Sequence, residues 1–215
     1  MEFQTILEGC GISAEIVALC LHKPSDQRDR LVLTTLAEQH PEIFDTYQST
    51  HSQQAEATLK SRAFMASFLA RGDASLTFIG LYRQAGWVDL SGDEFDQSPQ
   101  MQTMYRAFSS EGFAARGIDR RARFDLQPET ALAELRGRLV VADPGARAYM
   151  RRGETTSLPV LEIQRVPDLA PPLPDWRDVT LDADTVRSMP RKWADTLRHW
   201  RGIYLIVDES DGARY

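Results

Sequence analysis

Runs of apolar residues that end at turn-forming residues mark the first elements of the chain. Residues 16–21 form an unbroken apolar run before a Pro-Ser pair, which predicts a strand over residues 15–23. Residues 30–39 place leucine and alanine at helical spacing, which predicts a short amphipathic helix that ends before a proline. Residues 43–50 have no clear period, and the pattern leaves their structure open.

The clearest local signal is a β-hairpin. Residues 63–70 and 76–83 are apolar and aromatic, and the Arg-Gly-Asp-Ala-Ser segment between them predicts a turn. A glycine at position 80, inside the second strand, indicates a bend, a bulge or a close backbone approach. Strict alternation would give this strand one face with Leu76, Phe78, Gly80 and Tyr82, and another with Thr77, Ile79 and Leu81.

The middle of the chain alternates between short predicted strands and helices. The hairpin strand extends through Trp87, Val88 and Leu90, and the polar, acidic residues 91–99 predict a loop. Short helices are predicted at 99–108 and 128–135, and strands at 120–126, 138–141, 147–150 and 158–165. Closely spaced short strands with brief helices indicate an α+β fold built on a small curved mixed sheet or barrel.

A proline-rich segment divides the chain. Four prolines between positions 166 and 174 predict a stiff, extended linker. Residues 191–200 then predict a helix with an apolar stripe of Trp193, Leu197 and Trp200. We therefore expect an N-terminal recognition domain over residues 1–165, a proline-rich acidic linker over 166–185, and a helix with the start of a further domain over 186–215.

Composition places the chain among ordinary globular proteins. Its 215 residues are 42% hydrophobic and 26% charged, with a formal net charge of −6. No run approaches the roughly 20 apolar residues of a membrane-spanning helix, and residues 1–12 lack the pattern of a signal peptide. Cys10 and Cys20 are the only cysteines, which excludes a disulfide framework and a cysteine-rich zinc site. We expect a cytoplasmic protein without a membrane partner.

The C-terminal residues predict an incomplete β-hairpin. Residues 202–207 read as a strand, the Asp-Gly pair at 211–212 as a tight turn, and the last residues as the start of a return strand. This arrangement places Tyr204 and Tyr215 on neighbouring strands, where their two phenol groups could serve one site.

This hairpin resembles the opening of the GIY-YIG endonuclease domain. Gly202-Ile203-Tyr204 matches the first half of the family signature, and Tyr215 stands where the second half would begin. The preceding helix and residues 47–49 and 78–83 are similar to bacterial members of the family that carry a long N-terminal extension. The resemblance thus extends beyond the hairpin toward the whole chain.

The resemblance implies hydrolysis of DNA phosphodiester bonds, with Tyr204 and Tyr215 as catalytic residues that orient or activate water. In the family, an arginine and a glutamate-bound divalent metal, magnesium, stabilise the phosphate charge. That arginine and that glutamate have no counterpart after Tyr215, so we expect this chain alone to be inactive and to carry no metal. A homo-oligomer or a second chain could complete the hairpin at its open edge.

An arginine-rich window suggests how the first domain could recognise DNA. Residues 116–152 contain nine arginines against five carboxylates, in a chain that is acidic overall. Arginine suits phosphate because its planar fork donates two hydrogen bonds at once. The alternative is a solvated face with local ion pairs. The candidates for DNA binding are Arg120, Arg121, Arg123, Arg151 and Arg152.

Aromatic side chains offer a second route to nucleic-acid recognition, because rings can stack on an unpaired base. Packing in the core is the alternative for most of them. The candidates are Tyr47, Phe64, Phe78, Tyr82, Trp87 and Tyr105. Together these features predict the DNA-recognition or regulatory part of a GIY-YIG-type endonuclease. The alternative is a stand-alone module that binds nucleic acid or protein without catalysis.

Overall fold

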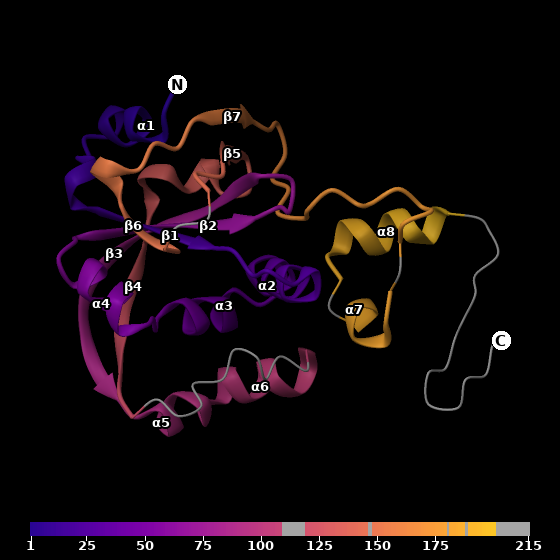
Figure 1. The fold of residues 1–215 in the computed structure, drawn as a ribbon, viewed down its shortest axis with the longest axis horizontal. Helices are drawn as coiled ribbons and strands as arrows, with labels where there is room; N and C mark the ends of the chain where they lie inside the picture. Colours follow the sequence, from indigo (N-terminus) through magenta and orange to yellow (C-terminus); the bar gives the residue numbers. More distant parts are fainter. Residues whose placement is uncertain (109–118, 146–147, 180, 188, 201–215) are drawn as a thin grey trace.

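The computed structural model describes residues 1–108, 119–145, 148–179, 181–187 and 189–200 (Figure 1). The described residues form an α+β fold, as predicted, around a mixed seven-stranded sheet that curls into a half-barrel. The sheet order is β6-β1-β2-β3-β5-β7, and β4 pairs with the far half of the long strand β3. The strands are β1 (Val17–His22), β2 (Phe64–Ala70), β3 (Ser75–Leu90), β4 (Arg121–Glu129), β5 (Leu139–Ala142), β6 (Met150–Arg152) and β7 (Val160–Ile163).

A helical crossover joins the two central parallel strands. Between β1 and β2 lie α2 (Gln27–Gln39), α3 (Pro41–Gln48) and α4 (Gln53–Lys60). The Asp26 carboxylate caps α2 by accepting backbone N–H groups, and the Ser52 hydroxyl caps α4 in the same way. Proline at the first position of α3 starts that helix, because its fixed φ suits the first turn. The segment 43–50 that the pattern left open is therefore mostly helical.

The predicted hairpin is confirmed, and it contains the predicted irregularity. Ser67 pairs with Gly80, but the next residue of β2 pairs with Phe78, so Ile79 is an extra residue in β3. After this bulge the alternation is reversed: Leu81 joins the core face with Phe78, while Tyr82 faces the helices. The predicted sharing of one face by Phe78 and Tyr82 is therefore wrong.

Helices cover both faces of the sheet. On one face α1 (Phe3–Gly9) inserts Phe3, whose ring centroid lies 5.1 Å from that of Phe68 and 5.7 Å from that of Phe78. On the other face, α2 and α3 pack with α5 (Gly92–Asp96) and α6 (Pro99–Phe108), and α4 packs on β1, β2, β4 and β6. Burial of these apolar faces is the main term that stabilises the fold.

Two local predictions in the middle of the chain are wrong. The predicted loop at 91–99 contains α5, because Ser91 and Glu94 form a capping box that satisfies the first backbone N–H groups. The predicted helix at 128–135 begins too early: β4 continues to Glu129, and a 3₁₀ turn over Thr130–Leu135 follows. The predicted helix at 99–108 is confirmed as α6.

The C-terminal helices lie to one side of the sheet (Figure 1). They are α7 (Ala183–Arg187) and α8 (Arg191–His199), and an extended segment after β7 leads to them. Trp193 of α8 is buried against Leu31 of α2, and its indole N–H donates to the Pro171 carbonyl at 2.8 Å. The domain boundary at residue 166 stays a prediction. Within the described ranges, no helix is long and apolar enough to cross a membrane.

Gly153 is expected to tolerate no side chain, because it packs on the main chain that leads into β1. A Cβ at this position would lie 2.5 Å from the Ala14 carbonyl oxygen and 3.0 Å from that of Val17. We expect Gly153→Ala to lower the free energy of unfolding by about 1–3 kcal/mol, measured by urea denaturation. Gly9→Ala is the control, because a Cβ there meets nothing within 4 Å; an equal loss in both variants would contradict the packing argument.

Candidate nucleic-acid interface and adjoining pockets

Three of the five candidate arginines lie at the start of β4, in different environments. Arg120 forms ion pairs with Asp89 at 2.9 Å and with Glu56 at 3.6 Å. Arg121 is half-buried, with its guanidinium 5.5 Å from the centroid of the Phe95 ring. Arg123 is exposed and forms no ion pair with the described residues. The local ion-pair alternative therefore describes Arg120, while Arg123 is available for an external phosphate.

The other two arginines lie in β6 and differ from each other. Arg151 donates to the carbonyl oxygens of Ala148 at 2.9 Å and Gly145 at 2.6 Å, so it holds the preceding turn together. Arg152 is exposed and makes no ion pair with the described part of the chain. Of the two arginines, Arg152 is therefore the one whose guanidinium is exposed to solvent and available to an external phosphate.

The curl of the sheet brings the strands of the two arginine groups to the same helix. Ala122 and Phe124 of β4 and Met150 of β6 share one buried cluster with Ala55 and Leu59 of α4. The two strands that carry the candidate arginines therefore both pack on α4, although they are not neighbours in the sheet. Arg121 and Arg123 alternate with Ala122 and Phe124 along β4, so their side chains lie on the opposite face of that strand. The candidate arginines do not form one continuous row.

Beside α4 the structure assembles an exposed indole and two cations. The side chain of Trp87 is 45% exposed, and the Lys60 ammonium lies 5.2 Å from its ring centroid. The buried Glu56 carboxylate holds the group together: it pairs with Lys60 at 3.2 Å, faces Arg120, and accepts the Ala122 N–H at 2.8 Å. We call Lys60, Trp87 and Arg120 the α4 patch.

The other aromatic candidates are buried or half-buried inside the protein. Phe64, Phe78 and Tyr82 are buried, and the Tyr105 hydroxyl donates to Asp96 at 2.7 Å. Tyr47 packs on the buried His22 and Phe44 rings. Among the six, Trp87 alone is classed as exposed. Sequence reasoning predicted no helix over residues 53–60 and missed Glu56 and Lys60, although an acid and a base four residues apart are a recognisable signal of one helix face.

A polar cluster lies buried between the sheet and α3. Burial lowers the pKa of His22 to about 4 and that of His51 to about 3, so both rings are neutral at pH 7. The Cys20 thiol lies 3.5 Å from His22 Nε2, but burial raises its pKa, and a protonated buried thiol is a poor nucleophile. This cluster therefore offers structure rather than thiol chemistry.

A pocket of about 900 Å³ opens where the sheet splits, between the end of β4 and β5. Asp45 of α3 lines it, and its Oδ1 accepts hydrogen bonds from Gln48 Nε2 at 2.8 Å and from the Tyr82 hydroxyl at 3.2 Å. Burial raises the pKa of the Asp45 carboxyl, and it raises that of Tyr82 to about 12. The lining also includes Gly80 at the bulge. We call this the Asp45 pocket.

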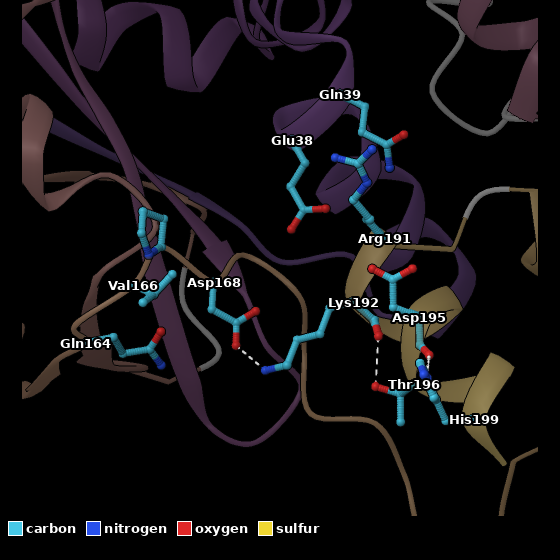
Figure 2. A pocket seen from close by; sticks show the side chains of 11 residues that line it. Glu38, Gln39, Gln164, Val166, Asp168, Arg191, Lys192, Asp195, Thr196 and His199 are labelled. Atoms are coloured by element: carbon cyan, nitrogen blue, oxygen red, sulfur yellow. Dashed lines mark hydrogen bonds and ion pairs between the residues drawn. The ribbon is translucent and has the colours of Figure 1, made fainter.

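A second pocket, of about 790 Å³, lies between the end of α2 and α8 (Figure 2). Lys192 of α8 forms an ion pair with Asp168 across it. On α8 itself, the Thr196 hydroxyl donates to the Lys192 carbonyl at 2.9 Å. Glu38 and Arg191 also line the pocket, so charges of both signs face one another there. This pattern is typical of a junction held by ion pairs.

The predicted catalytic residues Tyr204 and Tyr215 lie outside the described residues, as does the hairpin that would carry them. In the described part of the chain, no group of three His, Cys, Asp or Glu side chains could hold a metal ion. Comparison with protein-family models, with curated proteins and with solved structures finds no match to this chain.

Proposed function

We propose that residues 1–165 form the DNA-recognition part of a GIY-YIG-type endonuclease. The observation that carries the recognition half of this proposal is the α4 patch, in which a solvent-exposed indole lies under an ammonium group that shares the Glu56 carboxylate with Arg120. Nucleic-acid surfaces combine these features, because bases stack on aromatic rings while cations contact the phosphates.

The α4 patch can act on a polyanion despite the acidity of the whole chain. Glu56 already neutralises part of the charge of Lys60 and Arg120, and it holds both side chains to one carboxylate, with the Lys60 ammonium over the Trp87 ring. Arg123 adds a guanidinium without a carboxylate partner among the described residues. A fixed cation loses little conformational entropy when it meets a phosphate.

The catalytic half of the proposal is supported by the sequence resemblance at residues 202–204 and at Tyr215. In this proposal Tyr204 and Tyr215 orient the water that attacks the phosphodiester bond. Magnesium, when bound by the complete family domain, stabilises the charge that develops on the phosphate. The chain studied alone is proposed to bind DNA without cleaving it.

Loss of the indole or of the free arginine is expected to weaken DNA binding in distinguishable ways. Trp87→Ala should raise the Kd for DNA about 5- to 100-fold, because base stacking on an aromatic ring contributes about 1–3 kcal/mol. Arg123→Gln should instead reduce the slope of log K against log salt by about one unit, because one phosphate contact is lost. Fluorescence anisotropy at several salt concentrations measures both quantities.

Arg198→Gln is the matched control for these variants. Arg198 is also exposed, but it lies on α8 and pairs with Asp195 at 2.8 Å, away from the α4 patch. Its substitution should leave DNA affinity unchanged. DNA binding that is absent, or that shows no dependence on salt, would contradict the proposal and favour a stand-alone protein-binding module. Magnesium-dependent cleavage by this chain would contradict its expected inactivity.

A further inference from the structure

The Asp45 pocket has the features of a binding site that the DNA-recognition proposal does not use. Both hydrogen bonds to the Asp45 carboxylate, from Gln48 and from Tyr82, end on Oδ1. Oδ2 accepts none from the described residues, and the side chain is half-buried in the lining of an open pocket. A partly desolvated carboxylate oxygen without a donor favours a ligand that brings N–H groups.

A second acceptor without a partner lies next to this carboxylate. Gln48 is buried, and while its Nε2 donates to Asp45, its Oε1 has no hydrogen-bond partner among the described residues. Buried acceptors of this kind are rare in folded proteins and call for an explanation. Gln48 is not among the residues that line the pocket, so its contribution to the site is to hold Asp45 Oδ1 and leave Oδ2 for a ligand.

Charged side chains of both signs line the Asp45 pocket. Four carboxylates and three guanidinium groups line the Asp45 pocket. Arg136 donates to the Ile79 and Ala37 carbonyls at 2.7 Å each, and Arg138 donates to the Gln164 carbonyl at 2.7 Å, so both are occupied. Glu134 is exposed and forms no ion pair with the described residues. Glu129 is paired with Arg83 at 2.8 Å, so the charges of the lining nearly balance. The carboxylate oxygens of Asp45 and Glu134, without ion-pair partners among the described residues, are what suit a positively charged guest.

Prolines supply the apolar part of the lining. Pro41, Pro128 and Pro167 border the pocket together with Ile79 and Leu169. An alkyl stem can lie along such apolar surface while its charged head reaches the carboxylate. A guanidinium head fits better than an ammonium head here, because its planar fork pairs with a carboxylate in a fixed geometry.

We propose that the Asp45 pocket binds a guanidinium group, carried either by an arginine side chain of a partner protein or by a free small molecule. The Asp45 carboxylate pairs with the guanidinium through its open Oδ2. The pocket is formed by residues other than those of the α4 patch, so this proposal stands or falls independently of DNA binding.

Titration of the full chain with matched probes tests this site. Acetyl-arginine amide is compared with acetyl-citrulline amide, which has the same shape without the charge, and with acetyl-lysine amide. The readout is the backbone amide NMR shift of Gly80 and Leu81, which line the pocket. We expect saturable shifts with the arginine probe only. Equal responses to the citrulline or the lysine probe would overturn the proposal.

Asp45→Asn identifies the group that carries the affinity. Asparagine keeps Oδ1 as an acceptor for Gln48 and Tyr82, so the fold should persist, and near-UV circular dichroism checks this. The affinity for the arginine probe should fall about tenfold or more, because a hydrogen bond to a charged group is lost. Asp195→Asn, in the pocket beside α8, is the control. Unchanged affinity in Asp45→Asn, with the fold intact, would overturn the assignment.

A further titration, with a peptide, distinguishes the two sources of the guanidinium. A capped Gly-Gly-Arg-Gly-Gly peptide is titrated in the same way as the acetyl-arginine amide. Tighter binding of the peptide supports the proposal with a protein segment as the natural ligand. Equal binding of both probes supports it with a free small molecule.

Discussion

Acidification is expected to destabilise this protein steeply, because two histidines are buried in their neutral form. The pKa of His22 is lowered to about 4 and that of His51 to about 3, whereas an exposed histidine titrates near 6.5. Between these values the unfolded chain binds more protons than the folded protein, so stability falls as the pH falls. From pH 7 to pH 4.5 the two groups together should lower the free energy of unfolding by roughly 5 kcal/mol.

The surroundings of the two rings support this sign. His22 packs at 5.4 Å from Phe44, and His51 lies at 6.0 Å from both Phe124 and Tyr149, measured between ring centroids. No carboxylate in the described part of the chain forms an ion pair with either ring. Asp45 acts in the opposite direction, because burial raises its pKa and protonation relieves the cost of a buried charge.

Urea denaturation at several pH values measures the effect. His51→Gln should reduce the slope of stability against pH by about 1.4 kcal/mol per pH unit below pH 6, since one proton fewer is taken up on unfolding. The slope separates this effect from any loss of packing in the variant. His199→Gln, at an exposed position of α8, is the control. An unchanged slope in His51→Gln would contradict the buried neutral histidine.

The sequence predicted the elements whose signal is local. β1, the β2–β3 hairpin and α6 have apolar runs, turn residues or a starting proline within a few positions, and all three are confirmed. A bulge was one of the three alternatives that Gly80 indicated, beside a bend and a close backbone approach, and the structure shows the bulge next to this glycine. Its effect on Leu81 and Tyr82 was missed, since alternation gives no sign of one extra residue.

Features that depend on distant contacts could not be predicted. Glu56 of α4 meets Arg120 and the Ala122 N–H only because the sheet curls over α4. The Asp45 pocket depends on the gap between β4 and β5 along one edge of β3. The arginine count over residues 116–152 could not separate Arg151, which binds main-chain carbonyls, from the exposed Arg152.

Trp193 is expected to hold α8 against the rest of the protein. Its side chain is 2% exposed, contacts Leu31 and donates to the Pro171 carbonyl. Trp193→Ala should cost about 3–5 kcal/mol of docking free energy, because a large buried ring and its hydrogen bond are both lost. The loss should be local, since the main sheet core does not include this residue. Amide hydrogen exchange should show faster exchange in α8 and unchanged protection in β1 and β2.

Trp176→Ala is the matched control, because Trp176 lies in the same part of the chain but is 65% exposed. It should leave exchange in α8 unchanged; equal effects of the two variants would contradict the role of Trp193.

The docking of α8 also bears on the proposed function, because Tyr204 follows the end of α8 by only five residues. If α8 connects recognition to catalysis, Trp193→Ala should release α8 and leave DNA affinity at the α4 patch intact. A parallel loss of DNA affinity would show that the two parts are not separable in this way.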